Sequence, residues 1–180
     1  MAVLRHLTYT ELEAGLPQLR CAPQERGVLE MIVRRPRSGE REVLETADLT
    51  VAAGLVGDRW ALTEKRRLDE QVTLMGSRTI ALLAQSRDRW PLAGDQLYVD
   101  FDLSAAHVPP GTRLAIGAVV IEVSAEPHTP CKKFAERYGF DAVRFVSSAV
   151  GQELQLRGVN ARVVSGGAVR VGDFVRALFN

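Results

Sequence analysis

The chain is dominated by short apolar segments that are separated by glycine and proline turns, and helical stretches do not alternate regularly with them. The strand-like segments lie at residues 27–34, 42–50, 72–75, 96–102 and 113–124. A doubly wound parallel sheet requires regular strand–helix alternation, so this pattern argues against one. It predicts a mainly β (α+β) domain whose antiparallel sheet closes into a β-barrel, with a few short helices.

Helices are expected in a few places only. Thr10 to about Leu19 has acidic residues in its first turn, and Ser77 is placed to cap an apolar-periodic helix that reaches about Arg87. Residues 131–156 indicate two helical pieces broken near Gly139. Near the C-terminus, Gly166 and Gly167 separate two short apolar runs, which predicts a two-residue hairpin.

Composition narrows the class of protein. The 180 residues carry a net charge of +1, so no global field favours nucleic acid or an anionic membrane as a partner. No apolar run approaches transmembrane length, and the N-terminus lacks the apolar core of a signal peptide. Cys21 and Cys131 lie far apart and form no disulfide framework. A cytoplasmic location with reduced thiols is therefore expected.

The segment from Glu126 to Phe134 carries the strongest chemical indication. Thr129 suits a helix N-cap and Pro130 the first helical position, which would place Cys131 in the first turn. There the helix dipole and the cations of Lys132 and Lys133 favour a thiolate, which serves as a nucleophile or a metal ligand. The alternative is a core cysteine, because Cys131 shares a helical face with Phe134, Ala135 and Tyr138.

A zinc site that includes Cys131 is a further alternative. His128 and Cys131 are three residues apart and would form two corners of such a site. Zinc needs further ligands, and neither His6 nor His107 is spaced near them.

Four segments occur in an order that resembles the MOSC domain family, named from the C-terminal domain of molybdenum cofactor sulfurases. They are residues 57–59, residues 71–74, residues 114–123 followed by the 128–133 segment around Cys131, and residues 167–173. The resemblance implies a barrel of the kind found in the pyruvate kinase insert domain. We expect residues 27–180 to form this MOSC domain and residues 1–26 to form a helical extension packed on the barrel.

The resemblance also implies a function. Small stand-alone bacterial members of the family reduce N-hydroxylated compounds with a molybdenum cofactor, and the position of their metal-ligating cysteine matches Cys131. A molybdenum-dependent oxidoreductase is therefore one hypothesis, with Cys131 as catalytic residue and metal ligand. A pyranopterin cofactor carries a phosphate, which arginines at loop ends can clamp. The expected cofactor-binding residues are Arg59, His128, Lys132, Arg157 and Arg162.

Three departures from the family pattern bear on that hypothesis. Trp60 follows the Gly-Asp-Arg turn in place of histidine, Asp95-Gln96 stands where a Glu-Asn pair is common, and His128 replaces an arginine. Two alternatives therefore stay open: a sulfur-carrier or cofactor-binding module that uses a Cys131 persulfide, and a scaffold without cofactor. The chain has neither an iron–sulfur cysteine cluster nor a Gly-x-Gly-x-x-Gly run, so an oxidoreductase of this kind would need a redox partner protein.

Overall fold

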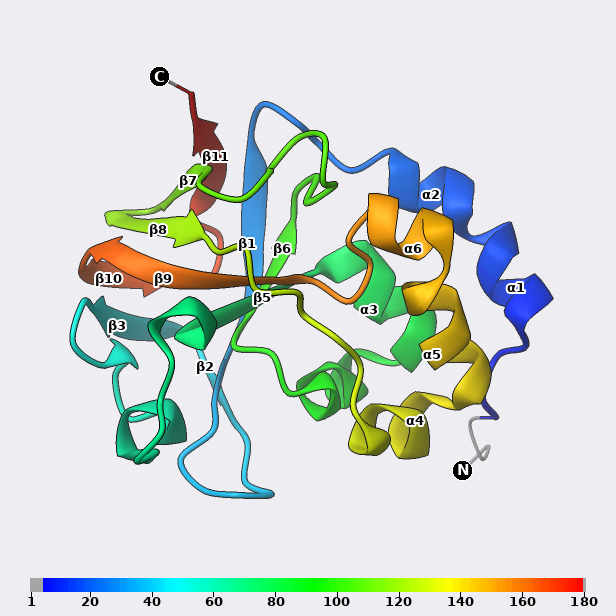
Figure 1. The fold of residues 1–180 in the computed structure, drawn as a ribbon, viewed down its shortest axis with the longest axis horizontal. Coiled ribbons are helices and arrows are strands. Elements are labelled where there is room, and N and C mark those ends of the chain that lie inside the picture. The colour runs from blue at the N-terminus through cyan, green and yellow to red at the C-terminus, as the bar shows by residue number, and fades with distance from the viewer. Residues whose placement is uncertain (1–4, 180) are drawn as a thin grey trace.

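A computed structural model describes residues 5–179, and its centre is a closed barrel of seven strands (Figure 1). Around the barrel the strands follow the order β11, β7, β8, β9, β5, β6 and β1, and β1 pairs with β11 to close the ring. The barrel strands are β1 (Gly27–Arg34), β5 (Val72–Gly76), β6 (Leu97–Asp100), β7 (Arg113–Ile116), β8 (Val119–Val123), β9 (Val159–Ser165) and β11 (Phe174–Leu178). The predicted mainly β barrel with short helices is confirmed.

The ladders are antiparallel except for one pair. Only β5 and β6 run parallel among the pairs within residues 5–179, and an α-helix (Ser77–Ala84) and a 3-10 helix (Arg87–Ala93) connect them. The predicted segment 113–124 forms two strands, and Gly117 adopts φ 54° in the tight turn between β7 and β8. The predicted segment 42–50 is divided at Glu45, because β2 (Glu42–Leu44) pairs with β1 whereas β3 (Thr46–Thr50) leaves for another sheet.

The second sheet has three strands and lies against one end of the barrel. Its order is β10 (Gly167–Arg170), β3 and β4 (Gly54–Leu55). The hairpin predicted at Gly166-Gly167 was wrong, because β10 pairs with β3 and not with β9. β9 pairs with β5 at residues 159–161 and with β8 at residues 161–165, and after Ser165 the chain continues into the smaller sheet.

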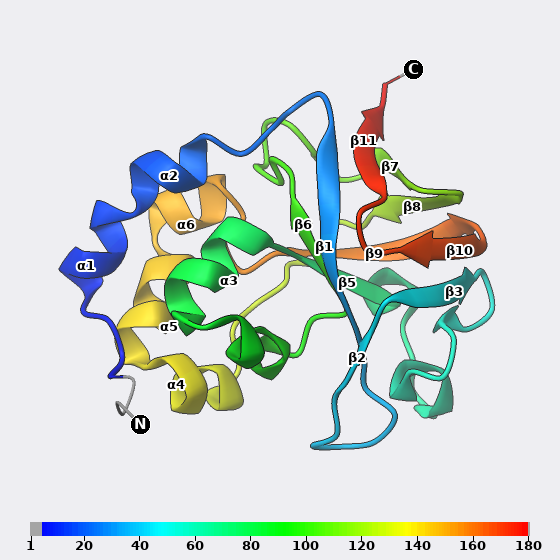
Figure 2. The same ribbon diagram turned by 180° about the vertical axis from the view of Figure 1, so that it is seen from behind.

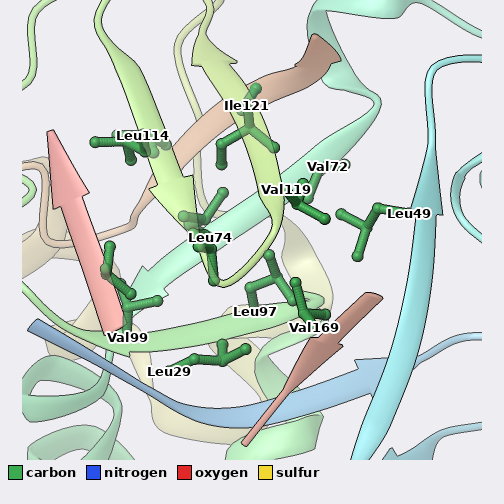
Figure 3. Packing of buried hydrophobic residues seen from close by; sticks show 14 of the residues in the cluster. Leu29, Leu49, Val72, Leu74, Leu97, Val99, Leu114, Val119, Ile121 and Val169 are labelled. Carbon is green, nitrogen blue, oxygen red and sulfur yellow. The ribbon is translucent and has the colours of Figure 1, made fainter. Parts of the chain in front are cut away.

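Two apolar cores lie on opposite faces of the same strands. The barrel interior is filled by aliphatic side chains that alternate along the strands, including Leu74, Leu97 and Val99 (Figure 3). Intervening residues such as Met75 and Tyr98 point outward into a second core beneath the helices. Burial on both faces explains why β5 is buried almost throughout.

The helices form a layer on one side of the barrel (Figures 1 and 2). They are α1 (Tyr9–Ala14), α2 (Leu16–Arg20), α3 (Ser77–Ala84), α4 (Lys132–Tyr138), α5 (Phe140–Ser147) and α6 (Ala149–Glu153). In the N-terminal extension α1 contacts α5 and α2 contacts α3. No helix within residues 5–179 has both the length and the apolar character needed to cross a membrane.

Several predicted helix boundaries need correction. The segment expected from Thr10 to Leu19 is two helices, because Thr8 caps α1 in a capping box with Glu11 and the chain restarts at Leu16. The segment 131–156 gives three helices, since a second break occurs at Ser148.

The start of α4 also differs from the prediction. The helix begins at Lys132, and Cys131 itself is the N-cap, with an extended backbone and no side-chain capping bond. Thr129 and Pro130 precede the helix, so Cys131 is not in its first turn.

Candidate functional site

A cationic cavity of about 550 Å³ lies where the 3-10 helices Arg59–Leu62 and Leu68–Glu70 face the segment 127–129. Its cations come from five residues: Arg35, Arg59, Lys65, Arg66 and Arg67. We call this the cationic cavity. The other lining residues are Trp60, Thr63, Glu70, Thr73, Pro127, His128, Thr129 and Asn160.

The Gly57-Asp58-Arg59 turn is held in place by a buried carboxylate. Asp58 is 1% exposed and accepts hydrogen bonds from the backbone N–H of Trp60 and from the Nε and Nη2 atoms of Arg35, the latter two at 2.9 and 2.8 Å. Burial pushes the pKa of Asp58 upward, but the hydrogen bonds and charge of Arg35 outweigh it and leave that pKa below its ordinary value. The turn therefore fixes Arg59 at the rim of the cavity.

The charges around the cationic cavity do not balance. Asp58 neutralises Arg35, and Arg67 pairs with Glu126 at 2.8 Å and with Glu70 at 3.3 Å. Arg59 and Lys65 form no ion pair with any carboxylate in the part of the chain that the structure describes. A cavity with uncompensated guanidinium and ammonium groups attracts an anionic ligand.

Beside the cavity lies a buried cluster of three ionisable residues, Asp95, His128 and Arg157. The Arg157 Nη1 atom donates to Asp95 Oδ2 at 2.7 Å, and the His128 Nδ1 atom lies 3.4 Å from Asp95 Oδ1. Asp95 is fully buried and Arg157 nearly so. The loop that carries Asp95 is fixed by Arg35, which donates to the carbonyl of Gly94 at 3.0 Å.

This group sets the charge state of His128. Burial lowers the pKa of His128 to about 4; Arg157 and Arg35 act in the same direction, whereas Asp95 opposes them. The imidazole is therefore neutral at neutral pH, and it serves as a hydrogen-bonding group rather than as a cation there.

A second cavity of about 640 Å³ adjoins the first. The two share Pro127, His128, Thr129 and Asn160 as lining residues. Its wall is mainly apolar and includes Val123, Pro130, Val143, Val146 and Val159, so we call it the apolar cavity. Arg157 lines it, with its Nε atom buried and without a partner.

The structure brings some of the predicted site residues together and separates others. Arg59, His128 and Arg157 surround the two adjoining cavities. Arg162 lines neither cavity and pairs with Glu122 at 2.7 Å. The Lys132 side chain is 91% exposed and lies 3.9 Å from Glu136.

Cys131 is exposed and free, and it lines neither cavity. It lies two residues after Thr129, which lines both, so the thiol is next to the site rather than at its floor. The buried, core-packed alternative for Cys131 is therefore wrong. Within residues 5–179 no three His, Cys, Asp or Glu side chains are grouped as metal ligands.

Several residues of the site escaped sequence reasoning. Arg35 and Lys65 belong to short basic runs in the sequence, which are usually solvated loops, although both line the cationic cavity. Asp95 and Gln96 were noted only as a departure from the Glu-Asn pair. The signal in the sequence was that Asp95 and Gln96 follow Gly94, because polar loop residues next to a turn often take part in binding. The structure shows this turn, with φ 90° at Gly94.

The structure combines a closed barrel, a helical layer on one side, and a cation-lined cavity next to an exposed thiol. These features are consistent with the family that the four sequence segments resemble. The pattern that defines the MOSC domain family matches residues 69–176, which is more than half of the chain. The chain belongs to the MOSC domain family.

Solved structures agree on the fold. The YuaD protein of Bacillus subtilis is 15% identical with a TM-score of 0.61, and the match covers 84% of this chain and 95% of that one. YiiM of Escherichia coli is 18% identical with a TM-score of 0.56, covering 85% and 70% of the two chains. YiiM of Geobacillus stearothermophilus is 14% identical with a TM-score of 0.58, covering 85% and 75%. No curated protein matches the chain by sequence.

Proposed function

We propose that the chain binds a molybdenum-carrying pyranopterin cofactor, with the phosphate in the cationic cavity and Cys131 as the thiolate ligand of the metal. The observation that carries this proposal is the set of cations without an ion pair in the described residues, Arg59 and Lys65 among them, in a cavity that Thr129, two residues before Cys131, also lines. Guanidinium and ammonium groups recognise phosphate, and thiolate suits a metal that dithiolene sulfurs already hold.

The residues present fit such a ligand. Trp60 and Arg66, with the guanidinium 5.7 Å from the indole ring, offer a flat surface at the cation-lined wall. Arg157 lines the apolar cavity, and its Nε atom has no hydrogen-bond partner within residues 5–179. Bound there, the cofactor would supply a redox-active metal centre.

The activity implied for this site is reduction of N-hydroxylated small molecules. Conversion of N–OH to N–H consumes two electrons and two protons and releases water. The apolar cavity next to Cys131 offers room for the body of such a substrate, and neutral His128 stands where the two cavities meet. The electrons would come from a redox partner protein.

A second candidate function is a sulfur carrier that holds a persulfide on Cys131. The exposure of the thiol outside both cavities favours it, because a partner protein must reach the sulfur to load or unload it.

The test is analysis of molybdenum, pterin and sulfane sulfur in protein purified from a host that makes the cofactor. If the proposal holds, the wild-type protein contains molybdenum and pterin in about equal molar amounts. Cys131→Ala should lose molybdenum and keep its melting temperature within the range of a surface substitution. Arg59→Ala combined with Lys65→Ala should lose pterin and molybdenum together.

The matched control replaces two exposed cations away from the cavities, Arg37 and Arg176, by alanine. It should keep the full cofactor content. If the wild-type protein carries sulfane sulfur but neither metal nor pterin, the cofactor-binding proposal is refuted and the sulfur-carrier function is supported. Protein with none of them would refute both.

A further inference from the structure

The two ring nitrogens of His128 have different surroundings. Nδ1 is fully buried and lies 3.4 Å from Asp95 Oδ1, and neither atom has a hydrogen-bond partner elsewhere within residues 5–179. Nε2 has no partner in that part of the chain either, but unlike Nδ1 it is not fully buried. Because His128 lines both the cationic and the apolar cavity, Nε2 is the ring nitrogen that a ligand can reach where the cavities meet.

Asp95 favours the tautomer of His128 that carries its proton on Nδ1. The Oδ2 atom of Asp95 already accepts a hydrogen bond from Arg157 at 2.7 Å, so Oδ1 is the oxygen left for the imidazole. Arg157 is itself held, because it also donates to the carbonyl of Ala93 and lies 4.9 Å from the ring of Phe134. A lone pair on Nδ1 would face a buried carboxylate oxygen, which is unfavourable. A proton on Nδ1 avoids this repulsion and leaves the lone pair on Nε2.

Hydrogen-bond donors dominate the charged groups around the two cavities. The carboxylates that line them, Glu70 and Glu126, both pair with Arg67. The other charged side chains of both linings are guanidinium or ammonium groups, which donate hydrogen bonds but cannot accept them. The Nε2 atom of His128 therefore places an uncharged acceptor among these donors.

We propose that Nε2 of His128 accepts the hydroxyl proton of an N–OH group, which makes the site selective for N-hydroxyl compounds over N-oxides and O-alkylated analogues. The inference rests on the function proposed above, because that function supplies the N–OH group. The oxygen of this group accepts hydrogen bonds from the cations, and the apolar body of the compound lies in the apolar cavity. An N-oxide or an O-alkyl ether has no proton for Nε2, so the lone pair would stay unpaired or face an oxygen, and either arrangement weakens binding.

Three probes with the same phenyl group test this selectivity. Benzaldoxime carries one N–OH proton, whereas its O-methyl ether and the isomeric C-phenyl-N-methylnitrone, an N-oxide, carry none. In isothermal titration calorimetry benzaldoxime should bind to one site per chain, and each of the other two should bind weaker by about tenfold or more. Equal affinities, or no binding of benzaldoxime, would overturn the inference.

A variant separates the hydrogen bond from the size of the added methyl group. His128→Phe keeps a flat ring without an acceptor, so the preference for benzaldoxime should disappear. A preference that persists in this variant would be caused by size and would contradict the role of His128. The matched control, His6→Phe, changes an exposed histidine and should keep the full preference.

Nitrogen-15 NMR of the imidazole rings measures the tautomer in the wild type, and this result is decisive even where His128→Phe fails to fold. At neutral pH the His128 signals should be those of a protonated Nδ1 and an unprotonated Nε2. The Nε2 signal should shift when benzaldoxime is added. A proton on Nε2 is incompatible with the inference.

Molybdenum and pterin are measured in the same samples, so the two proposals can fail separately. Protein that contains neither and still prefers benzaldoxime would refute the cofactor proposal and support the selectivity of His128. Protein that contains both and binds the three probes equally would refute the role of His128 alone.

Discussion

His128 is the residue at which the burial and the charges of the candidate site meet. It stands on the wall shared by the two cavities, next to a carboxylate that Arg157 already neutralises. A protonated imidazole there would place a third charge next to the buried Asp95–Arg157 ion pair. Because burying this charge is unfavourable, the pKa of His128 is lowered to about 4.

We expect the free energy of unfolding to depend on pH through the protonation of His128. In the unfolded chain the histidine protonates below about pH 6.5, whereas in the folded protein it stays neutral down to about pH 4. The unfolded state therefore binds more protons in that window, and the free energy of unfolding falls as pH drops from 6.5 to 4. The loss from this residue is up to about 3 kcal/mol.

Urea unfolding at a series of pH values measures this loss. His128→Gln should lose less stability between pH 6.5 and 4 than the wild type. His6→Gln, a change of an exposed histidine, should follow the wild-type curve. If His128→Gln followed it as well, the imidazole would not be held neutral by its surroundings.

At this scale the sequence identified local motifs better than long-range pairs. The Gly57-Asp58-Arg59 turn was recognisable, because it is a motif of three consecutive residues, although the ion pair of Asp58 with Arg35 that holds it was not. The interaction of Asp95 with Arg157 joins residues 62 positions apart, and no local spacing indicates it. The exposure of Cys131 likewise depends on where α4 begins relative to the barrel.

Among the structural elements, β9 is the most tightly constrained at its start. Gly158 precedes it with φ 102°, and a Cβ atom there would lie 2.1 Å from the carbonyl oxygen of Leu74 on β5. Glycine is needed for the backbone conformation and for the close approach of the two strands.

Gly158→Ala should therefore lower the free energy of unfolding by about 3 kcal/mol or more, from backbone strain and from separation of β9 from β5. The control is Gly111→Ala, which has φ 87° but nothing within 4 Å of its Cβ position. That change should cost about 1 kcal/mol, since it carries the backbone strain alone. Chemical denaturation measures the free energy of unfolding of both variants. Equal losses would show that the backbone around Leu74 moves to accept the new Cβ atom without a cost.

The existence of most strands was predicted from alternation and turn residues, but their pairing was not. The Gly166-Gly167 turn illustrates the difference: its sequence is that of a hairpin, yet β10 pairs with β3, which is more than 100 residues away in the chain, rather than with β9. Local chemistry fixes where a strand ends, whereas edge occupancy is a property of the assembled sheet.

At the scale of the whole molecule, the barrel and the helical layer share strands and should unfold together. Leu74 points into the barrel and its neighbour Met75 into the core beneath the helices, so neither core survives without the other. The chain has two tryptophans, Trp60 beside the cationic cavity and Trp90 in the helical core.

Trp60→Phe and Trp90→Phe each leave one local probe. In each variant the fluorescence transition should coincide with the loss of far-ultraviolet circular dichroism, as a single cooperative unit requires. A transition of Trp90 that precedes the dichroism change would show that the helical layer unfolds separately.

The class of fold was predictable from the sequence because strand density and turn spacing distinguish a barrel from a layered α/β sheet. The parallel pairing of β5 and β6 was not, since two helical segments separate the two strands in the chain. The position of the cavities depends on such crossings and emerges only in three dimensions.

The pairing of β1 with β11 bears on how the protein is made. The two strands are separated by nearly the whole chain, and β11 also lies next to β7. During synthesis from the N-terminus, the interior of the barrel stays open to solvent along this seam until β11 emerges. A ribosome stalled before residue 174 would therefore carry a sheet with two unpaired edges, at β1 and β7, which is a substrate for chaperones and a template for aggregation.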